Sequence, residues 1–154
     1  MNDIKIRTAK NTDLETLFHF QKAMAQESEG ITLDQEKLTA GLTAILSDTN
    51  IGTYYVAQLD GKTIACIMVT KEWSEWRNGH ALWIQSVYVK PENRRQGVYR
   101  HMYEHLQCIA RQEPSIIGIR LYVEKENHKA RSVYRELGMD ENRYIVCEWL
   151  KTSH

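Results

Sequence analysis

Hydrophobic and polar positions alternate at two spacings along this chain. A short apolar alternation over residues 4–6 predicts a first strand. Apolar residues at helical spacing then predict two amphipathic helices, over about residues 12–28 and 34–47. Thr12 and Glu15 fit a capping box, so the first helix is expected to begin there.

A β-hairpin is predicted in the middle of the chain. Two extended runs, residues 54–59 and 63–69, are joined by a turn at Asp60-Gly61. Both turn residues tolerate positive φ, which makes this pair a strong hairpin signal. The polar stretch from Lys71 to His80 is expected to be a loop.

The second half of the chain predicts two more helices and three more strands. The strands are expected at residues 82–89, 116–123 and 144–150, and the helices at 98–112 and 127–137. The resulting order is β-α-α-β-β-β-α-β-α-β in one domain, residues 1–154, which is a mixed α/β fold. Because a helix connects the third and fourth of the five long strands, these two are expected to be parallel neighbours. In open α/β sheets, ligands often bind beside such a pair.

Composition indicates an ordinary globular chain. It has 154 residues, 42% of them hydrophobic and 26% charged, with a formal net charge of zero. This balance gives no general signature of nucleic-acid or membrane-surface binding. Cys66, Cys108 and Cys147 are odd in number and far apart, which suits free thiols in a reducing compartment. The sequence shows no apolar leader and no 18-residue apolar run, so a cytoplasmic location is expected.

A local anion site is predicted between residues 89 and 100. A strand ending before Pro91 is followed by a basic turn, a single glycine at Gly97 and the start of a helix. Backbone N–H groups and the positive end of a helix dipole together bind phosphate in this arrangement. Neither GxxxxGK[ST] nor GxGxxG occurs, so the two most familiar phosphate motifs are absent.

Two motifs resemble those of the GNAT family of N-acetyltransferases. The sequence RRQGVY at residues 94–99, after V-K-P, resembles the family's acetyl-CoA loop, R/Q-x-x-G-x-G/A. Residues 127–138 fill every position of its later signature, N-x-x-A-x-x-x-Y-x-x-x-G. The resemblance covers nearly the whole chain and implies a single-domain GNAT fold, with a mostly antiparallel sheet flanked by helices and a splayed parallel strand pair at the cofactor site.

The resemblance implies acetyl-CoA as co-substrate. Backbone N–H groups from Arg95 through Arg100 would hold the pyrophosphate, the Val87 N–H would polarise the thioester carbonyl, and Tyr134 would protonate the leaving thiolate. Asn127 would hold the cofactor arm or the splayed strand. The implied cofactor-binding set is Val87, Tyr88, Val89, Arg94, Arg95, Gln96, Gly97, Val98, Tyr99, Arg100, Asn127, Ala130 and Tyr134. The alternative for Tyr134 is a ring packed in the core.

The chain departs from the family pattern at two places. Tyr99 stands where Gly or Ala is usual, and its side chain is expected to point away from the phosphates. Gln85 and Ser86 stand where many relatives carry a glutamate base, and neither acts as a base near neutral pH. The acceptor amine must then arrive neutral or meet another carboxylate. The candidates are Glu27, Glu29, Glu72, Glu75 and Glu148, of which Glu29 is the first choice.

The expected acceptor is a primary amine of a small molecule or peptide. Glu27 and Glu29 would suit a cationic amine, with Gln85 on the strand beside it. Trp73 and Trp76 are expected either to bind the acceptor or contact a second subunit, or to cover the sheet edge. A homodimer is an expectation by analogy with the family.

Two alternatives remain. The missing glutamate also suits an acyl-CoA sensor or a catalytically weak relative. The stretch HMYEH at residues 101–105 matches H-x-x-E-H, a zinc hydrolase pattern, but His105 falls on the apolar stripe of its helix, and no metal is expected. Direct transfer in a ternary complex is favoured because no histidine is placed to activate Cys66 or Cys147.

Overall fold

The computed structural model describes residues 3–151. The chain forms two compact units, Met1–Leu121 and Tyr122–His154. None of the helices within residues 3–151 is long and apolar enough to cross a membrane.

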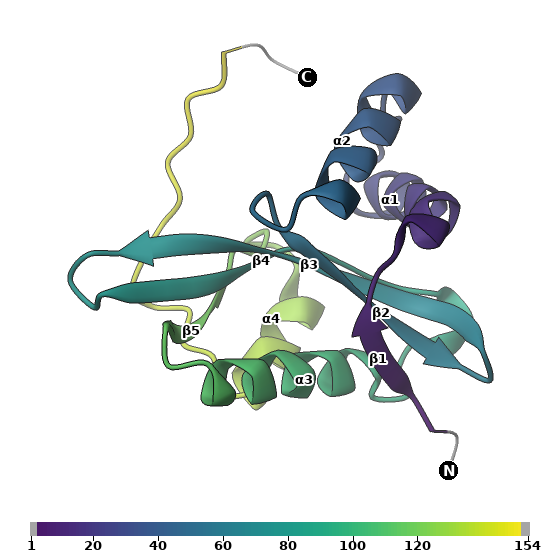
Figure 1. Cartoon of the computed structure of the whole chain (residues 1–154). Coiled ribbons are helices and arrows are strands. Elements are labelled where there is room, and N and C mark those ends of the chain that lie inside the picture. The colour runs from purple at the N-terminus through teal and green to yellow at the C-terminus, as the bar shows by residue number, and fades with distance from the viewer. Residues whose placement is uncertain (1–2, 152–154) are drawn as a thin grey trace. The chain divides into compact units, whose positions relative to one another are not determined.

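The first unit is built on a mixed five-stranded sheet of the described residues, in the order β1-β2-β3-β4-β5 (Figure 1). The strands are β1 (Lys5–Thr8), β2 (Thr53–Leu59), β3 (Lys62–Ser74), β4 (Gly79–Val89) and β5 (Ile116–Leu121). Each neighbouring pair is antiparallel except β4 and β5, which are parallel. The predicted hairpin at Asp60-Gly61 and the predicted parallel pair are both confirmed.

Helices cover both faces of this sheet (Figure 1). One face packs against α1 (Leu14–Glu29) and α2 (Gln35–Ser47), and the other against α3 (Val98–Gln112). The core on the side of α1 and α2 is formed by Leu17, Phe20, Leu42, Ile45, Tyr54, Val56, Cys66 and Tyr88. On the opposite side, Met102 and Leu106 of α3 are fully buried.

The predicted loop from Lys71 to His80 is wrong. β3 and β4 continue through it as a hairpin, with Trp73 paired to His80 and Ser74 to Gly79, and only residues 75–78 form the turn. Residues 71–73 and 75–78 are exposed. The alternation that marks a half-buried strand is therefore missing from the sequence.

The first helix does not begin with the predicted capping box of Thr12 and Glu15. A short 3-10 turn, η1 (Asn11–Asp13), precedes α1. The Asp13 carboxylate accepts the Lys10 backbone N–H at 2.7 Å and two hydrogen bonds from the Arg7 guanidinium, at 2.7 and 2.9 Å. Asp13 is only 6% exposed, so this carboxylate fixes β1 to the start of α1.

The second unit contains α4 (His128–Glu136). The Asn127 side chain accepts the Ala130 N–H at 3.2 Å as N-cap, and Gly138 ends the helix with a φ of 84°. The predicted final strand, residues 144–150, is wrong. The segment pairs with no strand among residues 3–151 and leaves Ile145 and Trp149 exposed. A strand requires a ladder partner, and an apolar run alone does not supply one.

Asp13 provides a test of this packing. We expect Asp13→Asn to lower the free energy of unfolding at pH 7 by about 1–3 kcal/mol, because it removes a charged acceptor of three hydrogen bonds. The Arg7 guanidinium lowers the pKa of Asp13, so the wild-type carboxylate stabilises the fold above its ordinary pKa and loses this contribution as pH falls through the lowered value.

Urea unfolding at several pH values measures both effects. The two proteins should therefore differ most near neutrality and converge in acid. Asp60→Asn, in the exposed β2–β3 turn, is the matched control and should change stability by under about 0.5 kcal/mol at every pH. A constant difference between wild type and Asp13→Asn down to pH 2 would contradict the assignment.

Candidate active site

The candidate site lies where β4 loses its second neighbour. β4 pairs with β5 over His80 to Ile84, but it continues along β3 as far as Val89. From Gln85 to Val89, the edge that faced β5 carries no strand ladder in the described part of the chain. Val87, Tyr88 and Val89 are thus on the open strand segment expected to hold the cofactor arm.

A β-bulge marks the position where pairing with β5 stops. Met68 of β3 pairs with Ser86, whereas the next residue, Val69, pairs with Ile84, so Gln85 is the extra residue on β4. Bulges re-aim side chains and end regular pairing. The Gln85 side chain donates to the Thr70 hydroxyl at 3.0 Å.

The residue after the bulge belongs to a buried polar cluster. Ser86 accepts a hydrogen bond from the Gln21 side chain of α1 at 3.5 Å and also bonds to Tyr54. Burial raises the pKa of the Tyr54 phenol, so this group stays neutral. The bulge therefore carries amide and hydroxyl groups where a carboxylate base was sought.

The basic turn has the backbone geometry of an anion loop. A short 3-10 turn, η2 (Pro91–Asn93), leads to Arg94, and the chain then enters α3 through two residues in the left-handed region. These are Arg95, with a φ of 60°, and Gly97, with a φ of 77°. A left-handed conformation costs a residue with a side chain about 1–2 kcal/mol, and such strain concentrates at functional sites.

The N-terminus of α3 is open to an anion. Gly97 provides no side-chain cap, and the first turn contains no acidic residue. The first N–H groups of a helix have no partner inside the helix, and acidic side chains there would repel phosphate. The first turn of α3, residues 98–100, therefore receives no side-chain cap from Gly97 and contains no negative charge. The Tyr99 ring stacks on the Tyr103 ring of the same helix, with ring centroids 6.2 Å apart.

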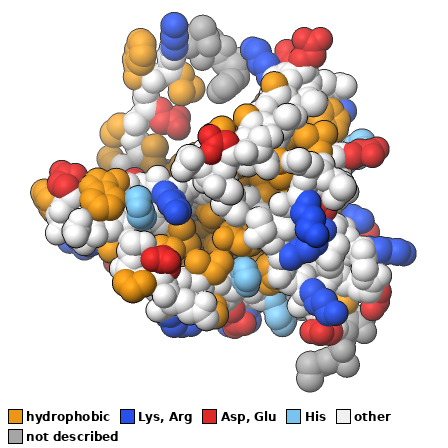
Figure 2. All heavy atoms as spheres, viewed as in Figure 1, with side chains coloured by type: hydrophobic (Ala, Val, Ile, Leu, Met, Phe, Trp, Pro, Cys, Tyr) orange, Lys and Arg blue, Asp and Glu red, His pale blue; other side chains and the backbone are white. Residues whose placement is uncertain are grey.

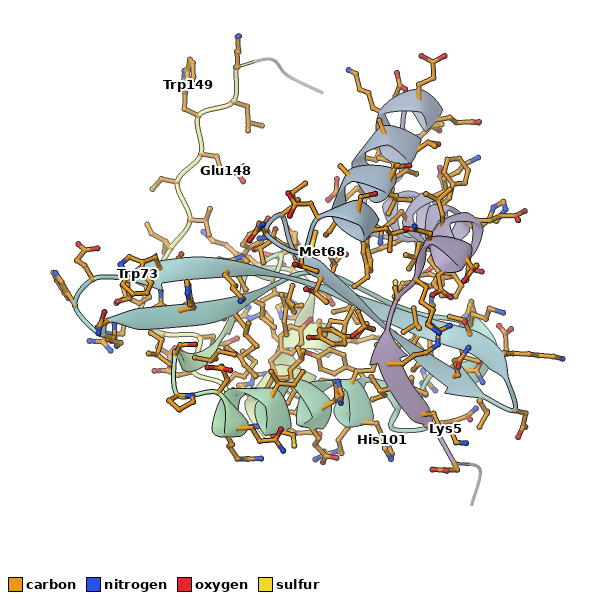
Figure 3. The ribbon with its side chains drawn as sticks, in the orientation of Figure 1. Lys5, Met68, Trp73, His101, Glu148 and Trp149 are labelled. Carbon is orange, nitrogen blue, oxygen red and sulfur yellow. The ribbon has the colours of Figure 1, made fainter. Side chains whose placement is uncertain are left out.

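Two of the acidic candidates are ion-paired. Glu27 contacts Arg94 at 2.6 Å, and Glu72 contacts Arg120 of β5. Glu29 is the exposed last residue of α1, and Glu75 is exposed in the hairpin turn. Glu148 lies in the exposed segment of the second unit, where Figure 3 labels it.

The two predicted acceptor tryptophans lie near the end of the β3–β4 hairpin. Trp73 is 54% exposed and packs edge-on against the His80 ring, with centroids 5.0 Å apart, and Trp76 in the turn is 90% exposed. Figure 3 shows Trp73 far from His101, which marks the first turn of α3. Trp73 is thus remote from the first turn of α3.

The histidines of HMYEH face different neighbours. The His101 ring lies 2.9 Å from the Gly97 carbonyl oxygen through Nδ1, whereas the His105 ring packs edge-on against Tyr55. Burial lowers the pKa of His105. Among residues 3–151, no three His, Cys, Asp or Glu side chains are grouped so that they could hold a metal ion.

The three cysteines differ in burial. Cys66 is buried in β3, and burial raises its pKa to about 12, which keeps the thiol protonated and unreactive at neutral pH. Cys108 and Cys147 are exposed.

In the second unit, the residues of the later motif lie on or next to α4. Asn127 caps the helix through Oδ1, Ala130 donates that hydrogen bond, and Tyr134 follows on the second turn. Arg131 makes two hydrogen bonds of 2.9 Å with Glu141, which holds the segment after the helix against it.

One cavity of about 210 Å³ lies elsewhere in the first unit. It is lined by Thr49, Asn50, Gly52, Thr53, Tyr55, Val69, Lys71, Leu82, Ile109, Glu113 and Ile116. In Figure 2, hydrophobic side chains gather on this face between the sheet and α3. None of the predicted site residues lines it.

Gly97 tests the backbone requirement of the loop. We expect Gly97→Ala to lower the free energy of unfolding by about 1 kcal/mol, because alanine is strained at positive φ. Steric overlap is not the cause, since an added Cβ would lie 3.8 Å from His101 Nδ1.

The control is Gly41→Ala in the middle of α2, where an added Cβ meets nothing within 4 Å. This change should raise stability by about 0.5–1 kcal/mol, the helical preference for alanine. Denaturant unfolding of both variants should give opposite signs, and equal signs would refute the conformational argument.

Comparison with known proteins agrees with this geometry. The model for "Acetyltransferase (GNAT) family" matches residues 14–139. No curated protein sequence matches the chain. A solved structure described as a possible acetyltransferase from Clostridium difficile 630 is 43% identical over 97% of this chain and 99% of its own, with a TM-score of 0.91.

More distant solved structures share the fold. Aminoglycoside N-acetyltransferase AAC(6')-Iy in complex with CoA is 16% identical, with a TM-score of 0.79, over 99% of this chain and 97% of its own. Ribosomal-protein-alanine N-acetyltransferase from Brucella melitensis biovar Abortus 2308 is 14% identical, with a TM-score of 0.79, over 96% of this chain and 99% of its own. On the family match and the 43% identity, this chain belongs to the acetyltransferase (GNAT) family.

Proposed function

We propose that the protein is an N-acetyltransferase that moves an acetyl group from acetyl-CoA to a primary amine. The observation that carries the proposal is the open β4 segment, Gln85 to Val89, which leads into an uncapped helix N-terminus through the left-handed residues Arg95 and Gly97. An extended arm suits the first feature, and a pyrophosphate suits the second.

The proposed reaction is a direct attack in a ternary complex. The amine nitrogen attacks the thioester carbonyl carbon, and the Val87 N–H stabilises the oxyanion that forms. The C–S bond then breaks as the amide forms, and Tyr134 donates its phenolic proton to the departing sulfur. The amine gives up its proton to Glu29 or to water. The buried Cys66 has no part in this scheme, because its thiol is protonated.

The proposed acceptor is a small-molecule or peptide amine. Glu29 at the exposed end of α1 suits a cationic acceptor. The two distant structural neighbours are named for different acceptors, an aminoglycoside and a ribosomal-protein alanine, so the shared fold does not select between the two classes. A screen of both classes with acetyl-CoA, read as free thiol, tests the activity directly.

One observation favours a second candidate function, an acyl-CoA sensor. Gln85 and Ser86 present only neutral groups at the bulge. A sensor would bind CoA and release no thiol with any amine of the screen, whereas an enzyme would release thiol in step with acetylated amine.

Tyr134 provides a test of the acid role. Tyr134→Phe should lower kcat by about 100-fold, the lower part of the range for general acid catalysis, because a thiolate is already a fair leaving group. The KM for acetyl-CoA should stay within about twofold, since a lost transition-state interaction lowers kcat more than it changes binding. Thiol release under saturating acceptor measures both constants.

Tyr144→Phe is the matched control, because it removes a hydroxyl from an exposed ring in the same unit. It should leave both constants unchanged. Unchanged thiol release from Tyr134→Phe would show that another group protonates the sulfur.

The pH dependence provides a separate test. Gln85 and Ser86 do not titrate between pH 6 and 10, so kcat/KM should rise about tenfold per pH unit until the acceptor's own pKa is reached. The plot of log kcat/KM against pH should bend at the acceptor's pKa. Exchanging the acceptor for an amine of lower pKa should move this bend by the difference between the two pKa values. A bend that stays at one pH for both acceptors would reveal a titrating group of the enzyme.

Glu29→Gln completes that experiment. A fall in kcat/KM of about 100-fold would identify Glu29 as the base, since general base catalysis contributes at least this much. An unchanged rate would show that Glu29 is not the base.

A further inference from the structure

Arg94 connects three parts of the first unit through one side chain. Its Nε donates to the Val89 carbonyl at 2.8 Å, at the end of β4. One terminal nitrogen donates to the Glu27 carboxylate of α1 at 2.6 Å. The guanidinium also lies over the Tyr88 ring, with its carbon 5.6 Å from the ring centroid.

These contacts stand immediately before the strained turn. Arg94 itself is extended, with a φ of −71° and a ψ of 158°, and the next residue is the left-handed Arg95. A residue held in a strained conformation needs surrounding contacts that fix it. Side chains on both sides of Arg95 provide such contacts. Arg94 bonds to β4 and α1, and Gln96 donates to the Glu92 carbonyl at 2.9 Å.

Glu27 is the only one of these partners that adds a charge. Arg94 contacts both the Glu27 carboxylate and the Val89 carbonyl, so the negative charge of Glu27 lies close to the end of β4. A carboxylate beside a phosphate site disfavours anion binding unless it is neutralised. Arg94 neutralises this carboxylate, so the pair adds no net charge to the site. Its contribution is to hold the backbone of the turn in place.

We propose that Glu27 and Arg94 form a clamp that positions the phosphate loop, residues 94–97, for the pyrophosphate of CoA. Glu27 is then a positioning residue instead of part of the acceptor site. Arg94 acts by holding the loop, and the backbone N–H groups that follow bind the phosphates. This inference rests on the proposed function for the identity of the anion.

The clamp predicts whether Glu27→Gln weakens or tightens CoA binding. If Arg94 were a phosphate ligand held back by Glu27, then Glu27→Gln would free the guanidinium, remove a repelling charge and tighten CoA binding. If the pair positions the loop, the same change loosens the loop and weakens binding. Both side chains are partly exposed, at 42% and 44%, so the expected loss in affinity is about three- to fivefold, the size of a favourable surface ion pair.

The experiment is calorimetric titration of the full chain with CoA and with pantetheine, which lacks the pyrophosphate. Glu27→Gln should raise the Kd for CoA and leave that for pantetheine unchanged. Glu27→Asp, which keeps the carboxylate, should restore part of the affinity for CoA. A general loss of folding would instead weaken both ligands alike.

Glu92→Gln is the matched control. Glu92 lies in η2, and its charge also raises the pKa of Tyr88, but it makes no ion pair among residues 3–151. Removing this charge should leave CoA affinity unchanged or slightly higher.

Three results would overturn the clamp. The first is tighter or unchanged CoA binding by Glu27→Gln. The others are a loss of pantetheine affinity in Glu27→Gln as large as its loss of CoA affinity, or a loss of CoA affinity in Glu92→Gln as large as that in Glu27→Gln. A wild-type chain that binds no CoA would overturn the proposed function itself, and the clamp with it. Normal binding by wild type with no change in Glu27→Gln would overturn the clamp alone.

Discussion

The unequal pairing of β4 is the constraint on which the site depends. As far as Ile84 the strand is held on both edges, and from Gln85 to Val89 it is held by β3 alone. Backbone N–H and C=O groups require partners, so an open edge inside a fold is a place where an extended molecule adds. The bulge at Gln85 falls at this same point, which directs one polar side chain toward Thr70 just where the ladder ends.

Charge at the phosphate loop is balanced within a few residues. The chain has no net charge, so it exerts no long-range attraction on a polyanion, and an anion must be recognised locally. The first turn of α3 contains no acidic residue, and the one carboxylate contact of the loop, from Glu27 to Arg94, is an ion pair. The first turn of α3 therefore adds no negative charge at the positive end of the helix.

Local features were predictable from the sequence, and features that join distant segments were not. Asp60-Gly61, Gly97 and Gly138 all have positive φ, as their positions in the sequence indicated, because a turn or helix end depends on a few neighbouring residues. The pair of Glu27 and Arg94 spans 67 positions, and no periodicity reveals it.

The wrong predictions have the same origin. Residues 71–74 are a strand because β4 pairs with them, despite side chains that indicate a loop. Residues 144–150 show the converse, since their apolar run indicates a strand but forms no strand ladder in the described chain. Strand formation depends on partners elsewhere in the chain, whereas propensity is only a weak local preference.

The neutral bulge makes the acceptor's own pKa part of the proposed specificity. An amine with a pKa of about 10.4, as in lysine, is neutral in about one molecule in 2,500 at pH 7, and one with a pKa of about 8, as in an α-amine, in about one in ten. Selecting the neutral form costs about 4.6 kcal/mol in the first case and about 1.4 kcal/mol in the second. With amide and hydroxyl groups at Gln85, Ser86 and Thr70, the bulge itself does nothing to offset that difference. In the proposed reaction without a carboxylate base, acceptors of lower pKa would therefore be favoured by about 3 kcal/mol at equal binding of the neutral amine.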